Sequence, residues 1–128
     1  DNIVLPLYGT YVSCGQPFMT DDSVDRPMSL DQEVVKNPGS TFFVRATGQS
    51  MEPTIFHHDI LVVDRSQKPV NNSIVLAYNA GEFTVKKYSK TAKGIALKPE
   101  NAKFSTIHVD ERKNFQVWGV VTCVVRKL

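Results

Sequence analysis

Two short segments of this sequence contain side chains that could carry out nucleophilic catalysis. In the first, Gly-Gln-Ser-Met at residues 48–51, Ser50 follows closely on a run of strand-forming residues. A glycine at that point lets the chain turn sharply, which brings backbone N–H groups near the serine, as an oxyanion hole requires. We therefore take Ser50 as a candidate nucleophile and the N–H groups of Gln49 and Ser50 as candidate oxyanion donors. Turns commonly contain serine, so this segment alone also fits an ordinary turn.

The second segment, Phe-Thr-Val-Lys-Lys at residues 83–87, contains a candidate general base. Side chains alternate between the two faces of a strand, so Lys86 and Lys87 point in opposite directions, and one of them faces inward if the strand is central. Removal from water disfavours the charged form of lysine and lowers its pKa. A neutral amine can then deprotonate a serine hydroxyl. Periodicity alone favours the alternative, an edge strand with both lysines in water.

The elements that position these segments are predicted to be mostly strands. In residues 1–40 only one short helix is expected, with Ser29 and Gln32 as a capping box and residues 37–39 as its end. Residues 79–81 are expected to form a hairpin loop. Runs of β-branched and aromatic residues predict strands over residues 41–46, 60–63, 74–78, 82–88, 94–99 and 115–125.

This pattern predicts a mainly β fold, a compact all-β sandwich or partly closed barrel with one short N-terminal helix. Residues 1–28 are expected to form a flexible arm and residues 29–128 a β-rich domain. In the last predicted strand, residues 117, 119, 121, 123 and 125 alternate with residues 118, 120, 122 and 124, and both faces are apolar. Burial on both sides follows, either as a central strand of one protomer or under a second protomer.

Composition narrows the classes of function. The chain has 128 residues, 41% hydrophobic and 22% charged, which is typical of one globular domain. Its net charge of +2 is too balanced to indicate nucleic-acid binding, which needs a concentrated basic face. No apolar run approaches the roughly 20 residues of a membrane helix. Cys14 and Cys123 have neither metal-ligand spacing nor the pattern of a disulfide framework. We expect a cytoplasmic protein with no metal, no other cofactor, no membrane contact and no sequence-specific DNA binding.

Four blocks taken together resemble the LexA/UmuD family of S24-like peptidases, and most closely its UmuD-type mutagenesis proteins. They are Gly-Gln-Ser-Met at 48–51, Asp-Ile-Leu-Val-Val-Asp at 59–64, Ile-Val-Leu-Ala at 74–77 and Gly-Glu-Phe-Thr-Val-Lys-Lys at 81–87. Any single block is weak, but the combination is specific and covers nearly the whole chain.

The resemblance implies a Ser–Lys dyad and a self-cleavage site. The family's serine precedes Met and its lysine is the first in the Thr-Val-Lys block, which here are Ser50 and Lys86, 36 residues apart. Lys87 would then be structural or solvated. The family cuts itself at a Cys-Gly or Ala-Gly bond, and Cys14-Gly15 offers one, with Cys14 lying 36 residues before Ser50.

The resemblance also implies partners. LexA-type repressors carry an N-terminal helix-turn-helix domain, which this sequence lacks, so a UmuD-like protein is expected. In that family a RecA–single-stranded DNA filament stimulates cleavage after DNA damage. The processed homodimer then joins the catalytic subunit of an error-prone translesion polymerase.

Two positions depart from the family pattern. His57-His58-Asp59 replaces an Asp-Gly-Asp turn, so a positive φ at the middle residue would strain His58. Asn72 replaces a glycine, and asparagine tolerates the left-handed conformation well.

Rival interpretations rest on fewer features. Ser-Met-Glu-Pro-Thr at 50–54 also resembles the nucleophile block of type I signal peptidases, but their membrane anchor and later Gly-Asp-Asn-Arg-like block are missing. His57, His58 or His108 could activate the serine, or bind a metal together with Asp59, although neighbouring turn residues rarely converge on one ion. A non-enzymatic class stays open, in which the chain is a dimeric, polymerase-docking module without meaningful protease turnover.

Overall fold

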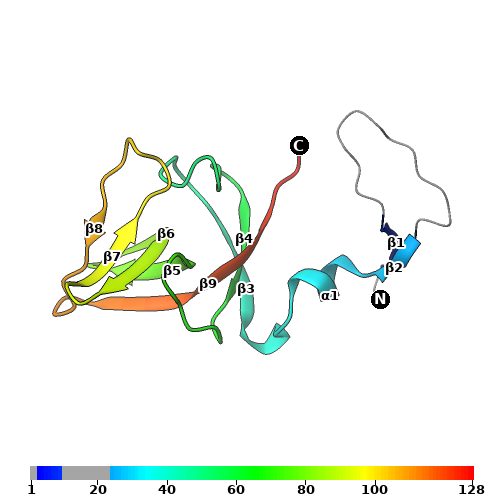
Figure 1. Ribbon diagram of the computed structural model, residues 1–128, viewed down its shortest axis with the longest axis horizontal. Coiled ribbons are helices and arrows are strands. Elements are labelled where there is room, and N and C mark those ends of the chain that lie inside the picture. The colour runs from blue at the N-terminus through cyan, green and yellow to red at the C-terminus, as the bar shows by residue number, and fades with distance from the viewer. Residues whose placement is uncertain (1–2, 10–23) are drawn as a thin grey trace. The chain divides into compact units, whose positions relative to one another are not determined.

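The computed structural model describes residues 3–9 and 24–128. The chain divides into two compact units, residues 1–36 and 37–128, which are taken here one at a time. Both are built on antiparallel β-sheet, with two strands in the first unit and seven in the second (Figure 1). The prediction of a mainly β protein is confirmed. The predicted boundary between residues 28 and 29 stays a prediction, and the Cys14-Gly15 bond lies outside the described residues.

The first unit pairs β1 (Leu5–Tyr8) with β2 (Val24–Met28), followed by the short helix α1 (Leu30–Val34). Neither strand was predicted, because proline is depleted in strands. Here Pro6 and Pro27 face each other in the register, and a two-stranded ribbon tolerates them because each strand has a free edge. Ser29 is the N-cap residue of α1, but its side chain makes no capping hydrogen bond, so the predicted capping box is wrong.

The second unit is an open seven-stranded sheet in the order β3-β4-β9-β5-β6-β7-β8. All its neighbouring strands are antiparallel, and β3 and β8 form its two edges, so these strands do not close into a barrel. Only the two-residue strand β8 was not predicted. The strands are β3 (Thr41–Arg45), β4 (Ile60–Asp64), β5 (Ile74–Asn79), β6 (Glu82–Thr91), β7 (Gly94–Lys98), β8 (Ile107–His108) and β9 (Phe115–Val125).

Strand β9 joins the two halves of this sheet, as Figure 1 shows where it runs between β5 and β4. It is therefore a central strand of one protomer. The register skips Trp118 opposite β5 and Thr122 opposite β4, and each skipped residue is a bulge that shifts the alternation by one. The predicted faces of β9 are consequently wrong: residues 118, 121 and 124 pack on one hydrophobic cluster, and residues 115, 117 and 120 on another.

Left-handed backbone occurs at the turns that the sequence singled out. The two-residue loop between β5 and β6 has φ angles of 50° at Ala80 and 93° at Gly81, which suits the primed turns that match strand twist. His58 has φ 74° and Asn72 has φ 76°. Both residues that replace a family glycine therefore have a positive φ, and His58 carries the greater strain because asparagine tolerates this region better.

The hydrophobic core of the second unit lies in two clusters. One is centred on the completely buried Leu61 and Val63 of β4, and the other on Val75 and Leu97.

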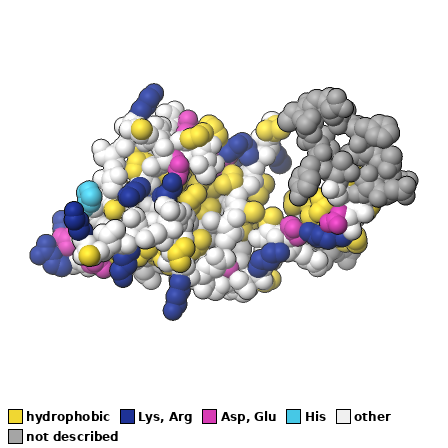
Figure 2. Space-filling model, viewed as in Figure 1, with side chains coloured by type: hydrophobic (Ala, Val, Ile, Leu, Met, Phe, Trp, Pro, Cys, Tyr) yellow, Lys and Arg dark blue, Asp and Glu magenta, His cyan; other side chains and the backbone are white. Residues whose placement is uncertain are grey.

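Some apolar side chains remain at the surface, among them Phe43 (62% exposed) and Phe83 (54% exposed). On the face seen in Figure 2, Lys and Arg side chains are scattered among Asp and Glu. No helix in the described ranges is long and apolar enough to cross a membrane.

Candidate active site

Ser50 lies in a loop of residues 46–59 that connects β3 to β4 and is closed at its base by backbone hydrogen bonds. The N–H of Ala46 donates to the carbonyl of Asp59, and the N–H of His58 donates to the carbonyl of Ala46, both at 2.8 Å. Met51 and Ile55 are only 4% and 3% exposed and anchor the loop in the core. The loop therefore presents Ser50 from a fixed base.

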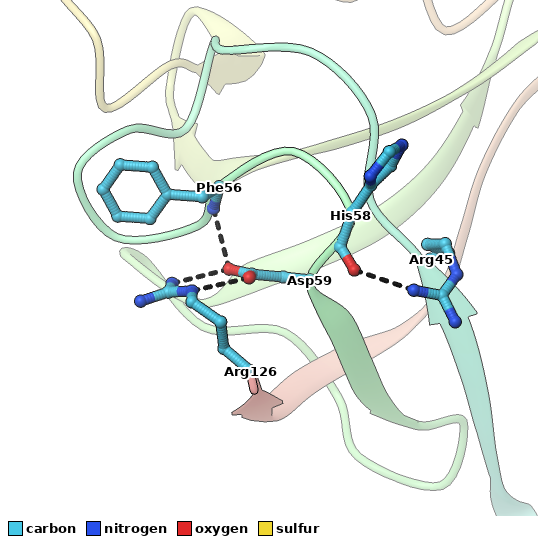
Figure 3. A network of polar contacts seen from close by, with 5 residues as sticks. All are labelled: Arg45, Phe56, His58, Asp59 and Arg126. Carbon is cyan, nitrogen blue, oxygen red and sulfur yellow. Dashed lines mark hydrogen bonds and ion pairs between the residues drawn. The ribbon is translucent and has the colours of Figure 1, made fainter. Parts of the chain in front are cut away.

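A buried carboxylate holds the C-terminal end of this loop (Figure 3). Asp59, 2% exposed, accepts two hydrogen bonds of 2.6 Å from the guanidinium of Arg126 and one of 2.8 Å from the N–H of Phe56. The Arg126 guanidinium also lies 4.6 Å from the centre of the Phe56 ring. The hydrogen bonds from Arg126 hold the pKa of Asp59 below its ordinary value despite burial. Arg45 donates to the carbonyl of His58 at 3.0 Å.

Lys86 reaches Ser50 from strand β6. Its Nζ donates to Oγ of Ser50 at 3.0 Å, to Oγ1 of Thr84 at 2.8 Å and to the carbonyl of Val85 at 3.3 Å. Lys87 instead forms an ion pair of 2.6 Å with Glu100. The two adjacent lysines thus have separate partners, as strand alternation predicts, and the two residues predicted as a dyad lie within hydrogen-bonding distance.

The environment of Lys86 favours its uncharged form. The residue is half-buried, and this desolvation lowers the pKa of Lys86 below the ordinary value for lysine. As an ammonium, Nζ donates its three protons to Ser50, Thr84 and the Val85 carbonyl. Once neutral, it keeps two N–H groups for Thr84 and Val85, and its lone pair is left to accept the Ser50 hydroxyl proton. The arrangement is therefore suited to general-base activation of a serine.

Ser50 and Lys86 open onto an apolar cleft of about 470 Å³. Its walls come from β3, β5, β6 and β9 and include Phe42, Val44, Leu76, Phe83 and Trp118. Such a cleft suits an extended peptide with small or apolar side chains, and it removes water from the reacting groups.

Of the two residues that carry the candidate oxyanion donors, Ser50 lines this cleft and Gln49 precedes it in the chain. Within residues 3–9 and 24–128, neither the N–H of Gln49 nor that of Ser50 donates to a protein acceptor. Within this part of the chain both groups are unpaired, as the donors of an oxyanion hole must be before substrate binds. Their assignment as an oxyanion hole stays a prediction, as do the catalytic roles of Ser50 and Lys86.

The histidines have other partners. Nδ1 of His57 accepts the N–H of Gly48 at 3.0 Å, and its ring lies 3.8 Å from that of His58. His108 belongs to the edge strand β8. Among the described residues, no three His, Cys, Asp or Glu side chains are grouped so that they could hold a metal ion.

Three residues near the site were not predicted to belong to it. Thr84 accepts a hydrogen bond from the Lys86 amine, Arg126 pairs with Asp59, and Asn101 contacts the Ser50 main chain. Thr84 was recognisable as sharing the strand face of Lys86. Asn101 and Arg126 had no local signal, because their contacts join segments 52 and 67 residues apart in the chain.

Known proteins of one family match almost the whole chain. The family model for peptidase S24-like proteins matches residues 6–122. The chain belongs to this family. The chain is 37% identical to protein SamA of Salmonella typhimurium over 123 residues, which is 95% of this chain and 85% of SamA. It is 35% identical to protein ImpA of Escherichia coli over 130 residues (99% and 87%) and to protein MucA of Escherichia coli over 120 residues (92% and 82%).

The alignments with these relatives cover almost the whole chain, so the family match is not confined to the segments around Ser50 and Lys86. The predicted resemblance to the LexA/UmuD family, and within it to UmuD-type SOS mutagenesis proteins, is confirmed. Membership of a peptidase family supports serine protease chemistry for this chain.

Proposed function

We propose that this protein is a UmuD-like SOS mutagenesis protein that cleaves its own chain with Ser50 as nucleophile and Lys86 as general base. The observation that carries the proposal is the 3.0 Å contact between Nζ of Lys86 and Oγ of Ser50 on the wall of an apolar cleft. A half-buried amine is a workable base near neutral pH only where its pKa is lowered, and burial lowers it here.

The reaction follows from the roles of the two groups. Neutral Lys86 removes the hydroxyl proton as Oγ of Ser50 forms a bond to the carbonyl carbon of the scissile peptide. The N–H groups of Gln49 and Ser50 stabilise the resulting oxyanion. The Lys86 ammonium then donates its proton to the departing amine as the C–N bond breaks, which leaves an ester on Ser50. Water, deprotonated by Lys86, hydrolyses this ester and regenerates the hydroxyl.

The proposed substrate bond is Cys14-Gly15, in the segment that lies outside the described residues. A small Cys14 side chain and a following glycine suit a carbonyl that must approach a crowded nucleophile. Because the substrate is part of the same protein, attack within one chain is unimolecular, and such positioning can lower the barrier by several kcal/mol.

The proposal includes the biological setting that the family resemblance implies. RecA–single-stranded DNA filaments stimulate the cleavage in the cytoplasm, and the processed homodimer serves as accessory subunit of a translesion polymerase. A docking module that does not cleave itself would have the same fold and the same exposed aromatic side chains. Cleavage of the Cys14-Gly15 bond therefore distinguishes the two functions.

The first expected result concerns the product. Pure protein incubated at alkaline pH should slowly lose residues 1–14, because high pH increases the fraction of neutral Lys86. Intact-mass spectrometry should detect the two fragments separated at the Cys14-Gly15 bond, and activated RecA filaments should accelerate their appearance near neutral pH. A Ser50→Ala sample prepared in parallel controls for contaminating proteases. An unchanged mass after prolonged incubation with filaments would favour the docking module.

The pH dependence provides a second expected result. The base is the deprotonated amine, so the self-cleavage rate should rise about tenfold per pH unit below the Lys86 pKa and level off above it. Burial lowers that pKa, so the midpoint should lie below the value of 10.5 that an ordinary lysine shows. Rates measured between pH 6 and pH 11 test this, and a flat profile or a midpoint at or above the ordinary value would contradict it.

A further inference from the structure

Asn101 contacts both peptide units that flank the Ser50 Cα. Its backbone N–H donates to the carbonyl of Ser50, and its side-chain Nδ2 donates to the carbonyl of Gln49, each at 3.0 Å. Asn101 lies in the connection between β7 and β8, 52 residues from Gln49. It is held in turn by its own loop, since Oδ1 accepts the N–H of Lys103 and its carbonyl accepts the N–H of Phe104.

The geometry of the peptide bond gives these contacts a consequence. A trans peptide unit is planar, and its C=O and N–H point in opposite directions. The Gln49 carbonyl shares its plane with the Ser50 N–H, so a hydrogen bond from Asn101 on one side fixes the direction of that N–H on the other. The Ser50 carbonyl belongs to the next plane. With both planes fixed, the backbone torsions of Ser50 are fixed, and so is the direction of the Cα–Cβ bond that carries its hydroxyl.

We propose that Asn101 is a positioning residue for the self-cleavage reaction: it aims the Ser50 N–H at the oxyanion and holds the Ser50 hydroxyl against Lys86. This inference rests on the proposed function, because it takes Ser50 as the nucleophile. Asn101 acts through the main chain of residues 49–50 and does not itself touch the reacting atoms. The side-chain amide is required because it is at once a donor toward Gln49 and an acceptor from Lys103.

Two substitutions separate the donor from the rest of the side chain. Asn101→Asp keeps the shape and the Oδ1 acceptor for Lys103, but replaces the donor with an oxygen that faces the Gln49 carbonyl. Asn101→Ala removes both side-chain contacts and adds no charge. Loss of an oxyanion donor costs about 10²–10³ in rate, and a misaimed donor retains part of its effect. We therefore expect self-cleavage to fall about 10–100-fold in both variants.

Asn71 supplies a matched control. Its side-chain amide also makes two hydrogen bonds to main chain, accepting from the N–H of Lys90 at 2.7 Å and donating to its carbonyl at 3.3 Å. It lies outside the lining of the cleft. Asn71→Ala should therefore lose a comparable pair of contacts and cleave at the wild-type rate.

The measurements are the self-cleavage rate from pH 6 to pH 11, by intact mass, and the melting temperature of each variant. A positioning role through the main chain predicts that Asn101→Ala lowers the rate by the same factor at every pH and leaves the midpoint of the profile unchanged, at temperatures where the variant is fully folded. If Asn101→Ala does not fold, the self-cleavage rate of Asn101→Asp, which keeps the Lys103 contact, tests the positioning role instead.

Rates within threefold of wild type in folded Asn101 variants would overturn the inference. So would a rate that is restored at high pH with a raised midpoint, because Asn101 would then act on the Lys86 pKa, or an equal loss in Asn71→Ala. These outcomes differ from a failure of the proposed function, in which Ser50→Ala would itself cleave at the wild-type rate.

Discussion

Replacement of Ser50 by alanine, or of Lys86 by methionine, should reduce self-cleavage by at least about a thousandfold, since removal of one member of a catalytic unit costs nearly as much as removal of all of it. Ser50→Ala removes the proposed nucleophile, whose Oγ lies 3.0 Å from Nζ of Lys86. Lys86→Met keeps a long apolar stem in the half-buried position but has no lone pair on nitrogen to accept the proton. Self-cleavage followed by mass spectrometry, with and without RecA filaments, measures both losses.

The adjacent lysine is the control for this experiment. Lys87 pairs with Glu100 on a partly exposed surface, and such pairs contribute about 0–1 kcal/mol. Lys87→Met should therefore cleave at nearly the wild-type rate, although it removes the same charge from the neighbouring position of the same strand. If Lys87→Met lost activity and Lys86→Met kept it, the assignment of the base would be wrong. If both methionine variants remained active, neither Lys86 nor Lys87 would be the base.

Substitution of Gly119 should have the largest effect on stability. Gly119 lies in the central strand β9, opposite Leu76 of β5. A Cβ at this position would lie 2.6 Å from Cγ1 of Val63 and 3.0 Å from the carbonyl oxygen of Asp64. Val63 is completely buried, and β-branched side chains have few alternative rotamers, so the neighbour cannot move aside without disturbing the core.

Overpacking of this kind costs about 1–3 kcal/mol, which corresponds to a fall in melting temperature of roughly 5–15 °C for a domain of this size. Gly119→Ala should show this fall in thermal unfolding, and Gly119→Val a larger one. Gly39→Ala is the control, because a Cβ there has no heavy atom within 4 Å. A Gly119→Ala protein as stable as the wild type would mean that β9 and β4 are not packed as described.

Much of the sheet could be predicted because strand formation leaves a local signal. The runs at residues 60–63 and 74–78 are apolar, β-branched and bounded by turn residues, and they became β4 and β5. The hairpin loop at residues 79–81 could also be predicted, because glycine there supplies the positive φ that the turn needs. Each of these features depends on residues a few positions apart.

The errors arose where a local rule was overridden by pairing with distant segments. The faces of β9 were predicted from strict alternation, but bulges at Trp118 and Thr122 let one strand follow both β5 and β4. The β1–β2 pair was missed because its prolines argued against strands. The site shows the same division, since the blocks around Ser50 and Lys86 were recognised from the sequence and the contacts of Asn101 were not.

The sequence by itself determined which segments become strands and which residues are candidates for nucleophile, base and cleavage site. Strand propensity, alternation and family motifs each depend on residues in a short stretch of chain. The sequence already assigned the base to Lys86, and the tertiary structure brings its Nζ to 3.0 Å from Oγ of Ser50. The tertiary structure alone decided that Arg126 pairs with Asp59 and that Asn101 holds the Ser50 main chain. These contacts join residues 36 to 67 positions apart. Their free energy depends on distance, burial and direction in the folded chain, and no local pattern encodes those quantities.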